Sequence, residues 1–242
     1  MGKQDDNQPA ALRFDGGNAL FKKPLMARPE EATVAEGIMN IYTVMGYDAV
    51  AVGVNDLAAG VELLKKNPKM PWLSANLVDD EGKRLFPASV TLTRGATRIG
   101  VIGLTGATPA SQSGVRAADW RSPLAAEIKR LRDQCHVLVA LSNLSAADNA
   151  KLVKDYSVID LLITADAARD NVAPHPEQKP WVVQTMSQGK SLGILTIFTD
   201  EPSVSPTNWH IRAVTVPLKL TMPEDAAIAN MVKNIQTAGA AR

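Results

Sequence analysis

The chain has 242 residues, with 26 Lys and Arg against 25 Asp and Glu and one cysteine, and at this length a large core can form without disulfides or metals. The balanced charge, without long runs of one sign, argues against a nucleic-acid polymer or an anionic membrane surface as the main partner. No stretch approaches the ~20 apolar residues of a membrane span, and Cys135, beside an apolar run, is more typical of a small buried hydrophobe than of a nucleophile.

Residues 1–8 are polar and are predicted to form a flexible N-terminal segment, and residues 9–242 a single domain. A short strand is expected over 11–15, running into the turn Gly16-Gly17-Asn18. A helix follows. Glu30 and Glu31 suit its positive end, and Gly46 supplies a left-handed stop. Its predicted inward face contains Val34, Ile38, Ile41, Tyr42 and Met45.

Residues 48–53 form a nearly continuous apolar run, typical of a strand that is covered on both faces. Leu57, Val61 and Leu64 predict a helix after it, and residues 71–76 predict the next strand. This order is a βαβ unit with a right-handed crossover. Asn55 and Asp56 stand at the turn where the first strand ends, which is where α/β proteins bind ligands.

The middle of the chain continues the alternation of strands and helices. Residues 89–93 and 97–103 predict a hairpin around Gly95, and Pro123 suits the first turn of a helix that reaches Leu131. Residues 137–141 and 159–163 predict two buried strands. Between them, Ser145 and Asp148 have the spacing of a capping box for a helix that ends near Tyr156.

The last third is predicted to contain a loop over 166–180 and three strands, at 181–184, 192–198 and 210–220, which we expect to be antiparallel. A capping box at Thr221–Glu224 predicts a closing helix, with Ile228, Met231, Val232 and Ile235 facing inward. There is no internal repeat. The predicted fold class is α/β, a layered α-β-β-α sandwich with mixed sheets and helices outside.

The ordered segments resemble the calcineurin-like metallophosphoesterase domain of the periplasmic 5'-nucleotidase family over nearly the whole chain. Asp15-Gly-Gly-Asn18 stands at its Asp-Ala-Gly-Asp turn, Gly53-Val-Asn-Asp56 at its Gly-Asn-His-Glu turn, and Leu141-Ser-Asn143 at its Leu-Ser-His segment. The framework matches are Trp72-Leu-Ser-Ala-Asn76, Arg98–Thr105, Asp160–Ala168, Val182–Thr185 and Gly189–Gly193.

The resemblance implies a hydrolase with two divalent metals, but the metal-binding motifs of this chain are degenerate. The family's bridging aspartate corresponds to Asn18, its ligand asparagine to Val54 and its catalytic histidine to Asn55. Its remaining histidine ligands correspond to Asn143, Asp166 and Ala168. Valine and alanine cannot bind a metal, and a neutral amide is a poor ligand beside a carboxylate. The family's opening Asp-x-His strand has no counterpart upstream of residue 11.

We therefore expect no two-metal centre and no resident cofactor. The resemblance also implies an exported, periplasmic protein, here without the family's C-terminal nucleotide-binding domain. Six polar residues stand at the matching positions and are expected to converge on one crevice that binds a small polar ligand or a protein partner, without turnover: Asp15, Asn18, Asn55, Asp56, Asn143 and Asp166. Within this set, Asn55 and Asp56 are the candidates for catalysis if any occurs.

Other interpretations of these residues stay open. Asn55 and Asp56 precede a helix, where Asn and Asp commonly cap free N–H groups, and Asp15 and Asn18 flank a glycine turn. An alternative function is a phosphoester or nucleotide hydrolase that uses one Mg²⁺ or Ca²⁺ ion held by Asp15, Asp56 and Asp166, because carboxylate oxygens suit such ions. Redox or metal chemistry at Cys135 is a third hypothesis.

Overall fold

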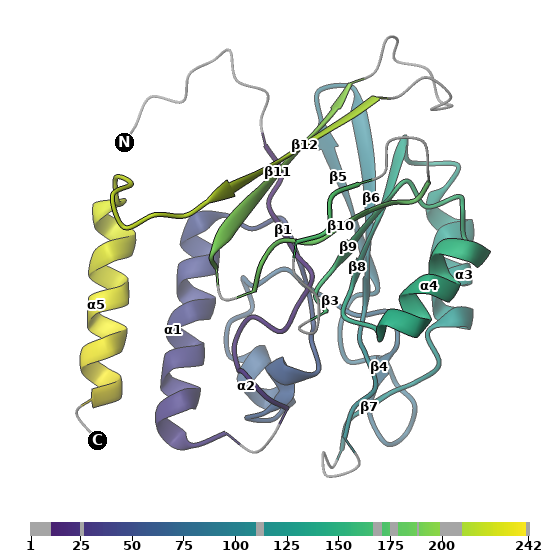
Figure 1. The fold of residues 1–242 in the computed structure, drawn as a ribbon. Coiled ribbons are helices and arrows are strands. Elements are labelled where there is room, and N and C mark those ends of the chain that lie inside the picture. Colours follow the sequence, from purple (N-terminus) through teal and green to yellow (C-terminus); the bar gives the residue numbers. More distant parts are fainter. Residues whose placement is uncertain are drawn as a thin grey trace.

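The protein is a layered α-β-β-α sandwich, as predicted (Figure 1). The structure is a computed structural model that describes residues 11–24, 27–109, 114–166, 171–174, 179–187, 189–198 and 210–240. The predicted flexible segment, residues 1–8, lies outside these ranges. Helices α1 (Pro29–Met45) and α2 (Val61–Lys65) cover one side of the two sheets, while α3 (Arg121–Leu131) and α4 (Ala146–Asp155) cover the other.

The first sheet contains the parallel strands β1 (Phe14–Asp15), β2 (Ala49–Ala51) and β3 (Trp72–Leu73), which confirms the predicted βαβ unit. Helix α1 ends, as expected, at Gly46, whose φ of 68° lies in the left-handed region. The helix predicted from Leu57 is instead interrupted. A 3₁₀ turn, η1 (Asn55–Leu57), is followed by Gly60 with a φ of 84°, and only then does α2 begin.

The second sheet has the strand order β10-β9-β8-β6-β5. It is formed by β5 (Ser89–Arg94), β6 (Thr97–Leu104), β8 (Val137–Ser142), β9 (Leu161–Thr164) and β10 (Trp181–Val183). Strands β5 and β6 form the expected antiparallel hairpin, and the other neighbours are parallel. The antiparallel prediction for 181–184 is wrong. This short apolar run carries no signal of direction, and in the structure it pairs in parallel with β9, with Trp181 beside Leu161.

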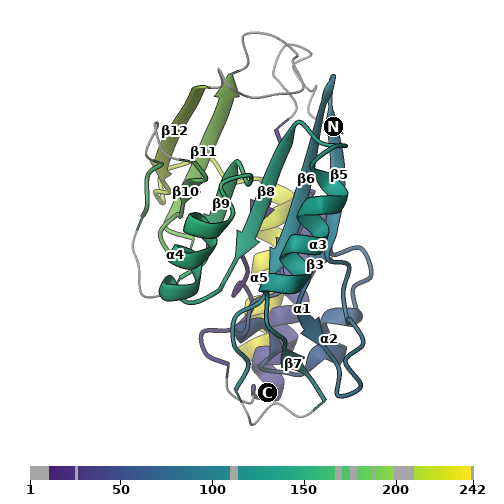
Figure 2. The same cartoon turned by 90° about the vertical axis from the view of Figure 1, so that its right-hand side faces the viewer.

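Strands β11 (Ser191–Phe198) and β12 (His210–Pro217) form an antiparallel ribbon, as predicted for this pair. One face of the ribbon carries Leu195, Ile197 and Ile211, which pack against the layer between the sheets. A small pair that the sequence did not indicate, β4 (Leu77–Val78) and β7 (Arg116–Ala117), is also antiparallel. Figure 2 shows the second sheet with α3 and α4 in front of it.

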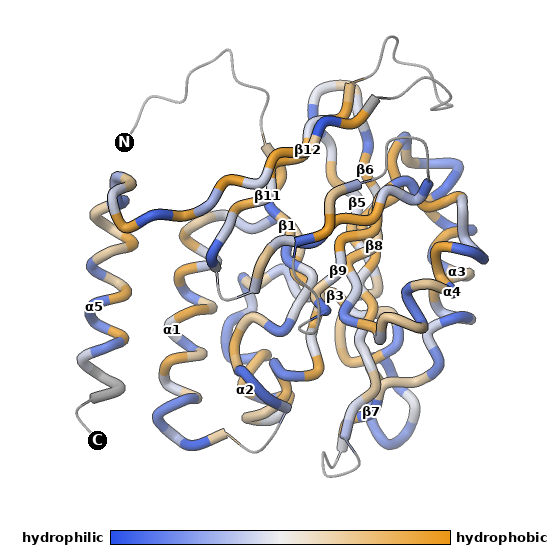
Figure 3. Tube along the Cα trace, viewed as in Figure 1, coloured by the Kyte–Doolittle hydropathy of each residue, from blue (hydrophilic) through white to orange (hydrophobic). Residues whose placement is uncertain are grey.

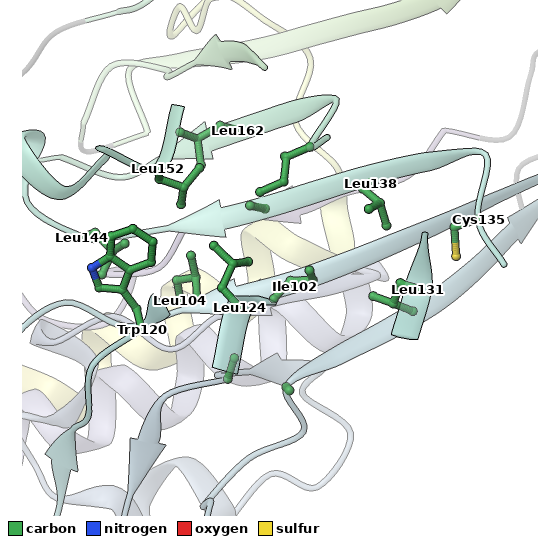
Figure 4. Close-up of a cluster of buried hydrophobic side chains, with 14 residues drawn as sticks. Ile102, Leu104, Trp120, Leu124, Leu131, Cys135, Leu138, Leu144, Leu152 and Leu162 are labelled. Atoms are coloured by element: carbon green, nitrogen blue, oxygen red, sulfur yellow. The ribbon is translucent and has the colours of Figure 1, made fainter. Parts of the chain in front are cut away.

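The two sheets divide the hydrophobic core into three clusters, one between the sheets and one under the helices on each side. Ala49 and Ala51 of β2 face the second sheet, whereas Val50 and Val52 face α1 and α2, as alternation along a strand requires. Strands β6, β8 and β9 are accordingly largely apolar (Figure 3). Beneath α3 and α4 lies a third cluster, in which Cys135 is buried near Leu131 and Leu138 (Figure 4). Burial of this thiol agrees with its expected role as a hydrophobe.

Helix α5 (Ala226–Ala240) packs against α1, where a side chain on Gly37 would overlap Ile235. It begins after the predicted box, because Asp225 Oδ1 accepts the free N–H groups of residues 227 and 228. The predicted inward faces are partly wrong: Val232 is 39% exposed and Met45 is 41% exposed. The residues of α1 that are fully buried are Ala35 and Met39. No helix in the described ranges is long and apolar enough to cross a membrane.

Candidate functional site

The six predicted site residues all follow strands at one end of the two sheets. Asp15 ends β1 and Asn18 follows it. Asn55 and Asp56 lie in η1 just after β2, Asn143 follows β8, and Asp166 follows β9. Because these strands are parallel within each sheet, their carboxyl ends meet at one edge. The fold thus places the six residues together at one edge of the two sheets, and this group of strand ends is called the crevice below.

Asp56 is completely buried and its carboxylate binds backbone groups only. Oδ2 accepts hydrogen bonds from the N–H groups of Gly53 at 2.8 Å and Asn18 at 2.9 Å, and Oδ1 accepts one from Leu20 at 2.8 Å. The side chain therefore ties the loop after β1 to the turn after β2. This is a wider structural role than the local helix cap that the sequence suggested.

Asn143 is 8% exposed and joins the two sheets. Its Nδ2 lies 3.2, 3.1 and 3.1 Å from the carbonyl oxygens of Gly16, Val52 and Leu104, respectively, so its two N–H groups are shared among three acceptors. Its Oδ1 accepts the N–H of Gly106 at 2.8 Å. These carbonyls belong to the ends of β1, β2 and β6, so a single amide connects three strand ends and a loop.

Asn18 and Asn55 are bound to each other. Asn18 adopts a φ of 62°, a left-handed conformation that Asn tolerates better than most residues, and its Oδ1 accepts the N–H of Asn55 at 2.9 Å. Its Nδ2 lies 3.4 Å from the carbonyl of Ala165, a long hydrogen bond. On the exposed side, Asn55 Nδ2 donates to the carbonyl of Lys22 at 3.2 Å. The side chain of Asn55 is thus at the rim.

Asp15 is half-buried and both of its oxygens accept hydrogen bonds. Oδ1 accepts from the N–H of Gly17 and Oδ2 from the hydroxyl of Tyr42, each at 2.8 Å. The ring of Tyr42 is stacked on that of Tyr47, with 4.2 Å between the centroids. The sequence placed Tyr42 on the inner face of its helix, but it did not indicate this contact with Asp15.

Asp166 stands at the second-sheet side of the crevice. Its backbone N–H donates to Gln184 Oε1, and its carbonyl accepts from Gln184 Nε2, both at 2.9 Å. The matching position at Ala168 lies outside the described residues. Within the described ranges, no three His, Cys, Asp or Glu residues lie close enough together to hold a metal ion.

The crevice is closely packed as well as hydrogen-bonded. A side chain on Gly17, whose φ is 100°, would approach the carbonyl of Ala51 to 2.8 Å and Asn143 Nδ2 to 2.9 Å. At Gly106, a Cβ would lie 2.5 Å from the carbonyl of Asn143. Contacts this short exclude any residue but glycine without a backbone shift, so the strand ends touch directly here.

Sequence reasoning missed a second buried network beside Asn143. The hydroxyl of Thr105 donates to the carbonyl of Val52 at 2.8 Å and lies 2.7 Å from that of Ser74. Asn76 Oδ1 accepts the N–H of Thr105 at 2.9 Å, and its Nδ2 donates to the carbonyls of Thr105 and Ala118. These residues lie in segments that match the family framework, and that match was the one feature of the sequence that could have indicated the network.

Burial changes the proton affinity of both crevice carboxylates. Desolvation raises the pKa of Asp56 to about 7, although the N–H groups of Leu20, Gly53 and Asn18 oppose the shift. Burial also raises the pKa of Asp15, against the bonds from Gly17 and Tyr42. The pKa of Tyr42 rises too, mainly through burial and then through the nearby Asp15 charge. Removing water from charged groups is the common cause.

Comparison with models of protein families and with curated protein sequences finds no match. Solved structures do match, over most of this chain. The sulfate thiohydrolase SoxB of Thermus thermophilus is 22% identical, with a TM-score of 0.76 over 94% of this chain and 42% of its own. A putative 5'-nucleotidase of Staphylococcus aureus is 17% identical, with a TM-score of 0.72 over 93% of this chain and 49% of its own.

The calcineurin-like phosphoesterase YfkN of Bacillus subtilis is 17% identical, with a TM-score of 0.68 over 94% of this chain and 83% of the other. This chain therefore spans less than half of the SoxB and S. aureus chains, but most of the B. subtilis chain. At identities this low, the structural likeness establishes the fold alone. The chain has the metallophosphoesterase fold shared by 5'-nucleotidases, SoxB and calcineurin-like phosphoesterases.

Proposed function

We propose that this protein is a metallophosphoesterase-fold domain that has lost the two-metal site and binds a small polar ligand or a protein partner without turnover. One observation carries the proposal: Asn143 and Asp56, at two positions that match family motifs, use their polar atoms to join strand ends. Asn143 Nδ2 donates to three backbone carbonyls, and Asp56 accepts three backbone N–H groups. The resemblance also predicts export, which fractionation of cells would test.

The residues present do not fit a pair of divalent metals. Two-metal catalysis needs ligands that hold both ions and stabilise the attacking and leaving oxygens. At the position of the bridging carboxylate stands the neutral Asn18, whose oxygen accepts the N–H of Asn55. Val54 offers no ligand atom. At Asn143 an N–H donor faces three carbonyls, so a cation at that point would have to displace the amide that holds the strand ends together.

A single Mg²⁺ or Ca²⁺ ion is the alternative that the sequence left open, with Asp15, Asp56 and Asp166 as ligands. The oxygens of Asp15 and Asp56 already accept five hydrogen bonds from the protein, two at Asp15 and three at Asp56. Binding of an ion through these oxygens would compete with those bonds, and Asp56 carries an added cost because burial disfavours its charged form.

Turnover assays with defined metals test the proposal. We expect no hydrolysis of p-nitrophenyl phosphate, bis-p-nitrophenyl phosphate or adenosine 5'-phosphate above the rate of metal alone, with Mn²⁺, Zn²⁺, Mg²⁺ or Ca²⁺ in turn. Hydrolysis with Mn²⁺ or Zn²⁺ that is lost in the Asp15→Ala variant would refute it. Hydrolysis with Mg²⁺ or Ca²⁺ alone, lost in Asp15→Ala and Asp166→Ala, would instead support the single-ion alternative.

A further inference from the structure

A second concave site lies at the amino ends of β2 and β3, away from the crevice at the carboxyl ends. It is a pocket of about 470 Å³. Asp48, just before β2, and Pro71, just before β3, contribute to its lining, together with the first residues of β5. Figure 2 shows α2, β3 and β5 on the same side of the molecule. A volume of this size is typical of a small-molecule site.

The lining is mainly apolar. Its apolar side chains come from the end of α2, from the residues around β3 and from the segment that leads into β5: Leu64, Pro68, Met70, Pro71, Trp72, Leu73, Leu85, Phe86, Pro87 and Val90. Two of these are aromatic, and several are rigid prolines. Such a surface favours a ligand with an apolar, preferably aromatic, body.

The charged side chains of the lining already have partners. Asp48 accepts from Arg94 at 2.7 Å through Oδ1, and from the N–H of Arg13 at 2.8 Å through Oδ2. Lys65 Nζ forms an ion pair with Glu62 at 2.7 Å. These pairings leave no strong reason for the pocket to select an ion.

The uncharged polar lining residues also have partners. Asn67 donates to Asn40 and Thr43 and accepts the N–H of Lys69. The hydroxyl of Ser89 donates to Glu127 at 2.7 Å. The lining thus offers these groups to a ligand only at the expense of existing hydrogen bonds.

Trp72 is different. It is 4% exposed, and its indole Nε1 is buried without a hydrogen-bond acceptor among the described residues. An unpaired buried N–H is costly, and few native donors are left in this state. The atom is covered in this structure, so an acceptor would reach it after a covering side chain moves. Met70 belongs to the same lining and has three rotatable bonds, so it is suited to such a movement.

We propose that this pocket binds an uncharged, largely apolar small molecule that carries one hydrogen-bond acceptor, such as a carbonyl oxygen, and that the acceptor pairs with the indole N–H of Trp72. The apolar walls bind the body of the ligand, and the indole fixes its orientation. The pocket shares no lining residue with the six crevice residues, so this proposal can be tested independently of the proposed loss of the two-metal centre.

The test uses nuclear magnetic resonance of the full chain labelled with ¹⁵N. The indole N–H signal of Trp72 is assigned by its absence in Trp72→Phe. Acetanilide, an aromatic ring with one carbonyl, is the probe, and n-propylbenzene, of similar shape without an acceptor, is the control ligand. We expect acetanilide to shift the Trp72 signal downfield and saturably, with a Kd near or below about 1 mM. The indole signals of Trp120, Trp181 and Trp209 should not move.

Two variants locate the site and separate its parts. Val90→Phe fills the pocket and should weaken acetanilide binding about tenfold, whereas Val158→Phe, at an exposed position outside the lining, should not. In Trp72→Phe, followed through the backbone amides of Leu64 and Phe86, acetanilide should bind no more tightly than n-propylbenzene. No saturable shift with the wild-type chain, or equal affinities of Trp72→Phe and wild type for acetanilide, would overturn the proposal.

Discussion

At the carboxyl end of β2, the carboxylate of Asp56 accepts three backbone N–H groups, whereas in β3 the indole N–H of Trp72 has no acceptor among the described residues. Asp56 lies in the turn that follows β2, and Trp72 lies in β3, the strand beside β2 in the same sheet. In the crevice, the polar side chains of Asp56 and Asn143 form hydrogen bonds with backbone groups, and the strand ends are in direct contact. The pocket has mainly apolar walls, and the indole N–H of its lining residue Trp72 is buried without an acceptor among the described residues. Polar side chains at strand ends can thus serve the packing of the fold, while a donor without a partner can lie at the other end of the same sheet.

Removal of the Asn143 amide should have the largest effect on stability. Asn143→Ala removes the amide from three buried carbonyls and leaves the N–H of Gly106 without its acceptor, while the carbonyl of Val52 keeps the hydroxyl of Thr105 and that of Leu104 keeps the backbone N–H of residue 143. We expect the free energy of unfolding to fall by about 4 kcal/mol, measured by urea denaturation. Asn55→Ala is the matched control, since Asn55 makes one exposed side-chain bond of 3.2 Å, and it should cost less than about 1 kcal/mol. Equal losses of unfolding free energy in the two variants would show that the Asn143 amide has no special structural role.

Asp56→Ala should rank next. The N–H groups of Gly53, Asn18 and Leu20 would lose their acceptor, at an expected cost of about 3 kcal/mol in the same denaturation experiment. Asp133, on an exposed position after α3, provides the control. Asp133→Ala should change stability by no more than about 0.5 kcal/mol. A small effect at both positions would show that the crevice network is not structural.

The pH dependence of stability should reveal the same carboxylate. The pKa of Asp56 is raised to about 7 in the folded protein, against about 3.9 in an unfolded chain. Between these values the folded state holds a proton that the unfolded state has lost, so stability falls as pH rises. Between about pH 5.5 and 7.5, this group should remove about 2 kcal/mol.

Asp56→Asn cannot titrate at this position and isolates that contribution. The advantage of the wild type over Asp56→Asn should be larger at the acid end of the range than at the alkaline end. Denaturant titrations of both proteins at several pH values measure this difference. An advantage that stays constant from about pH 5.5 to 7.5 would mean that the three N–H groups keep the pKa of Asp56 at or below its ordinary value, so that the carboxylate is ionised throughout this range.

The smallest effect is expected at the pocket. Trp72→Phe keeps most of the apolar contact and removes an unpaired buried donor, so the two consequences offset each other and the net change should stay within about 1 kcal/mol. Trp120→Phe is the control for loss of indole volume, because Trp120 packs edge-on against Tyr156 and beneath Arg121. It should cost more than Trp72→Phe in thermal unfolding. A larger cost at Trp72 would indicate a partner for its N–H.

Much of the fold could be predicted from local patterns. The apolar run at 137–141 and the Ser145–Asp148 spacing correspond to β8 and to α4, where Ser145 accepts the N–H of Asp148 as expected. The direction of β10 could not be predicted, because a three-residue apolar strand looks the same in either orientation. The inner faces of α1 and α5 were only partly predicted, since the contact at Gly37 and Ile235 depends on how the two helices meet.

The positions of the crevice residues could be predicted, but their bonds could not. The resemblance placed Asn143 and Asp56 at strand ends in one crevice. Whether such a side chain faces solvent or a backbone group depends on differences of less than an ångström in the distance between strand ends, as at Gly17 and Gly106. The contacts of Asn143 span up to 127 positions in sequence. The pocket was not predicted, because its walls come from separate segments and the motif that contains Trp72 was matched only as part of the framework.

Metal content after equilibration shows whether the strand ends around Asp15 hold a pair of metal ions. The purified chain is dialysed against Mn²⁺ or Zn²⁺ and then against metal-free buffer, and bound metal is counted by mass spectrometry, with Asp15→Ala as the reference for adventitious binding. We expect the same metal content in wild type and variant, well below one ion per chain. Two retained ions per wild-type chain, lost in Asp15→Ala, would contradict it and restore the crevice as a two-metal site.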